Sequence, residues 1–105
     1  MKRSTWHRVK APTPWRPEDG EELIGHYRGS KTRQGEFGEY LIHFIEARDI
    51  YFYVSGSMLN DLFTAVKEGD RVRLVFLGRK RTENDRELKV FELYSDKTTA
   101  FRMIG

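Results

Sequence analysis

Short hydrophobic runs follow one another along this chain, and their period changes once from that of a strand to that of a helix and back. Five runs rich in β-branched and aromatic residues are bounded by turn-forming residues, a pattern typical of β-strands. One run between the third and fourth has apolar residues at helical spacing. The predicted strands are Glu22–Arg28, Tyr40–Glu46, Ile50–Ser55, Arg71–Gly78 and Leu88–Tyr94, and the predicted helix is Met58–Lys67.

The order of these elements indicates a fold class. Three strands, a helix and two strands within about 75 residues is the order of the OB-fold. That fold is a Greek-key barrel that binds oligonucleotides or oligosaccharides on one face. We therefore predict a mostly β protein: a five-stranded OB-fold barrel with one short helix between strands 3 and 4. Fold alone does not fix function, so the ligand must be argued from side chains.

The chain divides into three segments. Residues 1–17 contain all three prolines and are predicted to form a flexible basic arm that docks only at its end, through Trp15. The turn signal Pro17–Gly20 opens the predicted domain, residues 18–95. Residues 96–105 are a predicted C-terminal tail.

Each predicted strand has a face that should point to the core. Inward positions are Tyr40, Ile42, Phe52, Val54, Val72, Leu74, Phe76, Phe91 and Leu93. Outward positions are Leu41, His43, Tyr51, Tyr53, Arg71 and Arg73. Gly25, in the middle of the first strand, predicts a bulge or sharp bend. Ser57 fits the N-cap of the helix and Gly69 the position after its end.

Charge is distributed unevenly along the chain. The net charge is +3, but residues 1–17 hold five Lys or Arg and no acidic residue, so the rest is slightly acidic. A polyanion site on the domain must therefore come from local clusters. Cysteine is absent, which excludes disulfides and thiolate metal sites. No apolar run is long enough for a membrane span or a secretion signal, so we expect a cytoplasmic protein that does not contact membranes.

Aromatic and basic residues gather where an OB-fold binds its ligand. Tyr51 and Tyr53 are predicted on the outer face with His43, where bases can stack. Basic residues lie in the two predicted loops beside that face: Lys31 and Arg33 with Phe37 in Gly29–Gly38, and Arg79, Lys80 and Arg81 in Gly78–Arg86. The arm adds Trp6 and Trp15. The alternative is that tyrosine simply favours strands, and that charged loops and a charged arm serve solubility.

Residue types that carry catalysis or bind metals form no motif here. The three histidines lack a carboxylate partner at any known metal or triad spacing. We therefore predict no catalytic residue, no metal and no cofactor.

Three segments carry a resemblance to a known group of proteins. Gly38–His43, Tyr53–Leu59 and Lys67–Lys80 resemble the corresponding parts of small OB-fold proteins of bacteriophages and mobile elements. The resemblance covers about residues 15–95, and it implies single-stranded DNA binding. The acidic C-terminal tail of bacterial single-strand-binding proteins has no counterpart here.

Together, these observations favour a non-enzymatic protein that binds single-stranded nucleic acid, DNA first with RNA as an open alternative. The competing hypothesis is a protein–protein interaction module of a phage, replication or recombination complex that uses the same aromatic face. A homodimer is compatible with either hypothesis.

Overall fold

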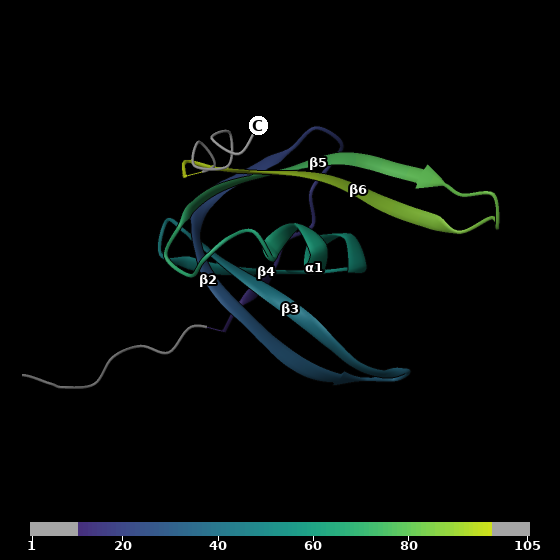
Figure 1. Cartoon of the computed structure of the whole chain (residues 1–105), viewed down its shortest axis with the longest axis horizontal. Coiled ribbons are helices and arrows are strands. Elements are labelled where there is room, and N and C mark those ends of the chain that lie inside the picture. The colour runs from purple at the N-terminus through teal and green to yellow at the C-terminus, as the bar shows by residue number, and fades with distance from the viewer. Residues whose placement is uncertain (1–10, 98–105) are drawn as a thin grey trace, which may run out of the picture.

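The computed structural model describes residues 11–97 and shows a single curled sheet with one short helix (Figure 1). The six strands lie in the order β1-β4-β3-β2-β5-β6. The elements are β1 (Thr13–Pro14), β2 (Glu22–Gly35), β3 (Gly38–Ala47), β4 (Ile50–Ser55), α1 (Ser57–Phe63), β5 (Arg71–Arg81) and β6 (Glu87–Ser95). Trp6 and most of the predicted arm and tail lie outside the described residues.

The sheet is mixed and forms a half-barrel. β1 runs parallel to β4, and every other neighbouring pair is antiparallel. The mostly β class with one helix between β4 and β5 is confirmed. The closed five-stranded barrel is wrong, because β4 and β6 are not paired within residues 11–97. α1 contacts both of these strands, and Trp15 reaches Phe91 of β6, so side chains rather than backbone hydrogen bonds connect the two edges of the seam.

Two strand pairs extend further than the sequence predicted. The predicted loop Gly29–Gly38 is wrong: β2 continues to Gly35, which pairs with Gly38, so the turn is only Glu36 and Phe37. A bulge between Tyr27 and Ser30 absorbs Gly29, whose φ is +89°. β5 and β6 likewise pair out to Arg81 and Glu87. The two hairpins project from the same side of the molecule, with α1 between them (Figure 1).

β2 joins the two halves of the sheet. Its first residues, Glu22–His26, pair with β5, and its pairing with β3 begins at His26. Gly25 lies where the backbones approach closely, because a Cβ there would clash with the carbonyl oxygen of Glu46. The predicted bend at Gly25 thus has a packing reason, while the bulge itself lies three residues further on.

α1 is shorter than predicted. It begins at Ser57 with Gly56, not Ser57, as the N-cap residue, and it ends at Phe63 rather than Lys67. After Phe63 the amides bond three residues back, as in Val66 N to Phe63 O at 3.1 Å. Thr64 and Val66 are weak helix formers, which favours these tighter turns.

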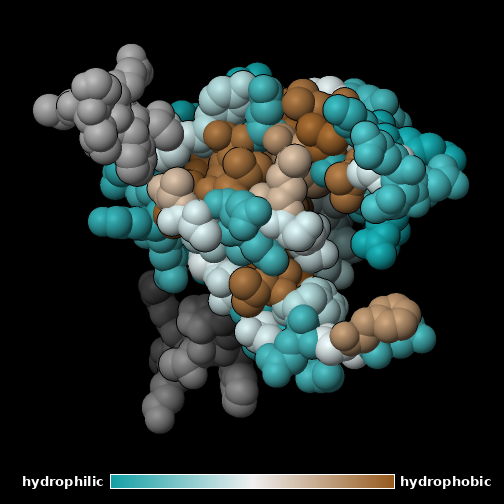
Figure 2. Space-filling view, turned by 45° about the vertical axis from the view of Figure 1, so that its right-hand side comes forward, coloured by the Kyte–Doolittle hydropathy of each residue, from teal (hydrophilic) through white to brown (hydrophobic). Residues whose placement is uncertain are grey.

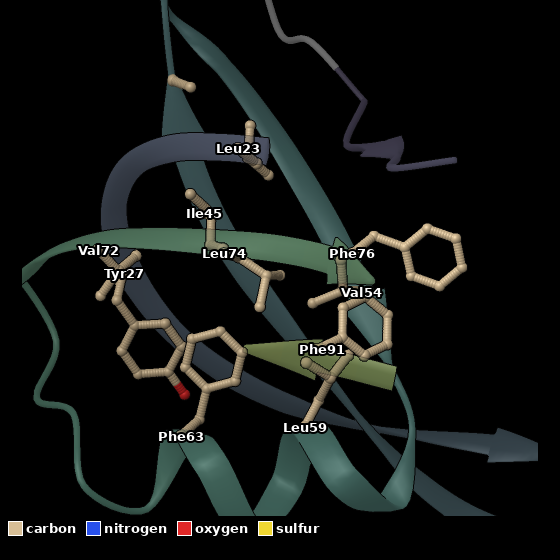
Figure 3. Packing of buried hydrophobic residues seen from close by; sticks show 11 residues of the cluster. Leu23, Tyr27, Ile45, Val54, Leu59, Phe63, Val72, Leu74, Phe76 and Phe91 are labelled. Atoms are coloured by element: carbon tan, nitrogen blue, oxygen red, sulfur yellow. The ribbon is translucent and has the colours of Figure 1, made fainter. Parts of the chain in front are cut away.

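The core lies between the concave face of the sheet and α1, from which Leu59 and Phe63 point towards the strands (Figure 3). Val54, Val72, Leu74, Phe76 and Phe91 are buried, and Phe52 and Leu93 pack against them, so these inward predictions are confirmed. Arg71 and Arg73 are exposed, as predicted.

The predicted faces of β3 are wrong. His43 pairs with Val54, which points inward, so His43, Ile45 and Ala47 share the core face. Ile42 is buried, but its partner in the ladder is Ser55, which places it on the opposite face. Tyr40 is exposed, and Leu41 is half-buried. The sequence of β3 is apolar at both parities, so only pairing with β4 decides which set faces the core.

Candidate nucleic-acid interface

The convex side of β3 and β4 carries a row of aromatic side chains, which we call the aromatic face: Tyr40, Phe44, Tyr51 and Tyr53. The register aligns Phe44 with Tyr53 and Glu46 with Tyr51, all directed away from the core. Tyr51 is 43% exposed, and Tyr53 is half-buried. The predicted outward orientation of Tyr51 and Tyr53 is therefore confirmed. Rings presented side by side on a sheet offer a stacking surface for bases.

Two cations from β2 border this face. Lys31 pairs with Ile42 and Arg33 with Tyr40, so both point to the same side as the tyrosines. The Arg33 guanidinium carbon lies 5.5 Å from the centroid of the Tyr53 ring, within cation–π range. Within residues 11–97 neither cation has a carboxylate partner at ion-pair distance. Both lie on a strand rather than in the predicted loop, which fixes their direction.

One ion pair borders the aromatic face beside Tyr51. Arg28 Nε donates to Glu46 Oε1 at 2.7 Å, and this bond raises the pKa of Arg28. The pair neutralises Arg28, a cation that interacts electrostatically with Tyr51. Positive charge available to a phosphate therefore concentrates on Lys31 and Arg33, towards the hairpin tip.

A cleft of about 490 Å³ opens at the seam between β4 and β6, and we call it the seam cleft. Trp15 forms one wall, with its ring centroid 6.5 Å from that of Phe91. Cations from three separate segments line it: Arg16, Arg79 and Lys89. Tyr53 belongs both to this lining and to the aromatic face, so the two surfaces are continuous.

The basic cluster of the β5–β6 hairpin is partly neutralised. Arg79 donates to Glu87 at 2.9 Å and Arg81 to Asp85 at 2.7 Å. Lys80 has no such partner among the described residues. These three residues were predicted in a loop, but they lie on β5, and only Arg79 reaches the seam cleft.

His43 does not belong to the interface, because it is only 3% exposed and faces the core. The Tyr27 hydroxyl lies 3.1 Å from Nδ1, and Nε2 lies 2.7 Å from Oδ1 of Asn60. The Phe63 ring stacks at a centroid distance of 4.6 Å (Figure 3 shows Phe63 and Tyr27). Burial lowers the pKa of His43, although the bond to Asn60 acts in the opposite direction. A neutral imidazole with a proton on Nε2 satisfies both hydrogen bonds.

Phe37 occupies the tip of the β2–β3 hairpin and is 98% exposed. It is therefore not part of the core. The acidic residues Glu36 and Glu39 flank it, so the tip carries negative charge where a phosphate would approach. This local charge argues against its predicted contact with nucleic acid.

Several residues of these surfaces were not predicted as site residues. Tyr40 and Phe44 were missed because both faces of β3 look alike in sequence. Arg16 and Lys89 were missed because they meet only through the fold, from β6 and from the segment after β1. The sequence did hold one signal for Lys89. It lies two residues before Phe91 in β6, so it points to the same face of the strand as that inward residue.

Two further features are absent from the described part of the chain. Residues 11–97 contain no group of three His, Cys, Asp or Glu side chains that could hold a metal ion. No helix in this part is long and apolar enough to span a bilayer. Comparison with protein-family models, with curated proteins and with solved structures finds no match to this chain. Function must therefore be argued from these surfaces alone.

Proposed function

We propose that this protein binds single-stranded nucleic acid, DNA in the first place, without catalysing a reaction. The observation that carries the proposal is the placement of Arg33 over Tyr53, at the junction of the aromatic face and the seam cleft. Sequence-tolerant binding of single strands combines rings for the bases with cations for the backbone. Here both kinds of group lie along one continuous surface.

We interpret the half-barrel as an OB-fold opened at one seam, and this interpretation supports the proposal. β2 to β6 and α1 follow the element order of that fold, and the pairing that would close the barrel is absent. In an OB-fold, oligonucleotides bind the face of the second and third barrel strands and the two hairpin loops beside it. In this chain the equivalent elements are β3 and β4, with the β2–β3 and β5–β6 hairpins on either side.

The proposed path of the strand follows from the charges. Bases stack on Tyr51 and Tyr53, and Lys31 and Arg33 meet phosphates along β2. The strand then passes Tyr53 into the seam cleft, where Arg16 and Lys89 offer positive charge. Arg79 can exchange the exposed Glu87 carboxylate for a phosphate at small cost, because exposed ion pairs are worth only about 0–1 kcal/mol.

Salt dependence distinguishes this function from a protein-binding face. With four cations on phosphates, a log–log plot of affinity against salt should have a slope near −2.8, at about −0.7 per contact. Between 50 and 200 mM salt, affinity for labelled oligothymidine should fall roughly 50-fold. Fluorescence anisotropy with oligothymidine and oligouridine measures both the slope and the preference for DNA.

A matched pair of variants sharpens the test. Arg33→Gln should weaken binding and make the slope shallower by about 0.7. Arg73 is a cation of equal charge that also lies over a tyrosine, Tyr94, but on the other half of the sheet. Arg73→Gln should therefore leave both the affinity and the salt slope unchanged. Affinity that does not respond to salt, or equal effects of the two variants, would exclude the aromatic face as the binding surface. A protein interaction module would then be the better hypothesis.

A further inference from the structure

The hairpin tip presents an apolar side chain that the fold of one copy does not use. Phe37 is 98% exposed, while the turn it occupies needs only the flanking Gly35 and Gly38. Phe37 itself does not have a positive φ, so the turn geometry does not select it. A large ring held out in solvent is typical of an interaction anchor.

The part of the β2–β3 hairpin that carries Phe37 stands free of the sheet. β4 pairs with β3 only from Ile42 onwards, so residues 32–41 form a two-stranded ribbon. Such a ribbon is marginally stable on its own in water. Contact with a further surface would therefore stabilise it as well as cover the ring.

The molecule also has an apolar groove that fits such a ring. It measures about 520 Å³ and lies between the first turn of α1 and β6. Its apolar lining comprises Met58, Leu59, Leu88 and Phe91. Met58 is 39% exposed and Leu88 is 46% exposed. Figure 2 shows hydrophobic surface exposed on this side of the molecule, bordered by hydrophilic lobes. A flexible methionine at the rim suits a surface that adapts to an incoming ring.

Charges at the tip and beside the groove are opposite. Glu36 and Glu39 flank Phe37. Lys89 lines the groove, and Lys80 lies beside Leu88 in the strand ladder. Of the acidic residues at the groove, Glu87 is already paired with Arg79, which leaves Asp61 as the opposing charge. The net positive charge beside the groove therefore favours binding of an acidic segment.

From these observations we propose that two copies of the chain form a closed dimer in which each Phe37 enters the groove of the other. Both hairpins extend to the same side of the molecule with α1 between them (Figure 1), and the groove lies between the first turn of α1 and β6. A two-fold axis therefore satisfies both contacts at once, as in isologous interfaces. This inference does not rest on nucleic-acid binding, because its anchor, Phe37, lies on neither proposed binding surface, although Lys89 lines both the groove and the seam cleft.

Sedimentation equilibrium of the full chain tests the dimer. The wild-type protein should approach twice the monomer mass as its concentration rises. Phe37→Ala should raise the dissociation constant about tenfold or more, as expected for an aromatic anchor. Ile24→Ala, which truncates an apolar residue that is 42% exposed on another surface, should leave the constant unchanged. Circular dichroism of each variant confirms that it is folded.

Disulfide trapping tests the contact itself, because the chain has no cysteine of its own. Phe37→Cys mixed with Leu88→Cys should give a cross-linked heterodimer on oxidation, whereas Ile24→Cys mixed with Leu88→Cys should not. A wild-type protein that stays monomeric, or a mass that Phe37→Ala does not change, would overturn the proposal. Mass growth beyond two copies would overturn the two-fold arrangement. Loss of oligothymidine affinity in Phe37→Ala without a change in mass would instead assign Phe37 to nucleic acid.

Discussion

Trp15 and Phe91 meet across the seam of the half-barrel, with ring centroids 6.5 Å apart and planes tilted by 39°. Trp15 comes from the segment after β1, and its backbone amide donates to the carbonyl oxygen of Tyr53 at 3.1 Å. Phe91 belongs to β6. The contact therefore joins the two strands that a closed barrel would pair directly, and it makes the end of the arm part of the fold.

Truncation of Trp15 should weaken the fold and widen the seam cleft. Trp15 is partly buried against the core cluster, so Trp15→Ala should cost about 2 kcal/mol, less than the ~3–5 kcal/mol for a fully buried aromatic. Urea denaturation followed by circular dichroism measures the change. Arg16→Ala, next along the chain but exposed, should stay within about 0.5 kcal/mol of wild type. Equal stability of Trp15→Ala and wild type would mean that the arm does not hold the seam.

Substitutions of two adjacent residues of β4 should affect nucleic-acid binding and stability differently. Tyr51→Ala should reduce oligonucleotide affinity by about 1–3 kcal/mol if the ring stacks on a base. It should hardly change stability, because an exposed ring leaves no cavity. Phe52→Ala should lower stability by about 2–4 kcal/mol, because its ring packs on the core, with little effect on the affinity of the folded fraction. Anisotropy titration and urea denaturation of both variants give the comparison, and a reversed pattern would contradict the assigned faces.

Stability should decrease in mild acid because of His43. Burial lowers the pKa of His43 in the folded state below the usual value near 6.5. Above that value the side chain is neutral in both states. As the pH falls below it, the unfolded chain gains a proton that the folded chain does not, so unfolding becomes easier by up to about 1.4 kcal/mol per pH unit.

The pH effect can be assigned with two histidine variants. His43→Gln should remove the acid-dependent loss between about pH 6.5 and the lowered folded pKa, whatever its own stability at neutral pH. His26→Gln alters an exposed histidine of the neighbouring strand and should retain the loss. Thermal melts at a series of pH values measure both. The same pH dependence in His43→Gln as in wild type would show that other groups cause it.

Gly25→Ala tests the close approach of β2 to β3. The added Cβ would clash with the Glu46 carbonyl oxygen and lie 2.9 Å from Cγ2 of Ile45. Overpacking against backbone should cost about 3 kcal/mol. At Gly20, where φ is +86° but the space is open, Ala should cost about 1 kcal/mol through backbone strain alone. Chemical denaturation ranks the two variants, and an equal cost would mean that the backbones can move apart.

Sequence patterns sufficed for elements whose two faces differ. β5 alternates arginine with apolar residues, so the inward positions of Val72, Leu74 and Phe76 followed directly from the period of two. The tyrosines of β4 were placed correctly because Phe52 and Val54 were assigned to the core and neighbouring residues of a strand alternate between its faces. β3 carries apolar side chains on both faces, and there the register with β4 decides what local pattern cannot.

Contacts between distant segments account for the other differences. The polar stretch Ser30–Gln34 reads as a loop, yet it forms a strand because the facing residues of β3 satisfy its backbone. The seam cleft depends on Arg16, Arg79 and Lys89 arriving from three parts of the chain. The distance between β4 and β6 depends on the side chains that lie between these strands, and no local sequence pattern encodes that distance.

His26 is the only residue of β2 whose Cα has a ladder partner on both sides, Glu46 in β3 and Arg71 in β5. The pairing of β2 therefore passes from β5 to β3 at His26, beside Gly25, and the two hairpins diverge from this point. A small additional bend at this point would displace residues further along each hairpin by a larger amount. The largest displacement falls on Phe37 at one end and on the turn after Arg81 at the other. Beside this point the Tyr27 ring stacks on Phe63 at a centroid distance of 4.6 Å, a core contact that opposes such a change of bend.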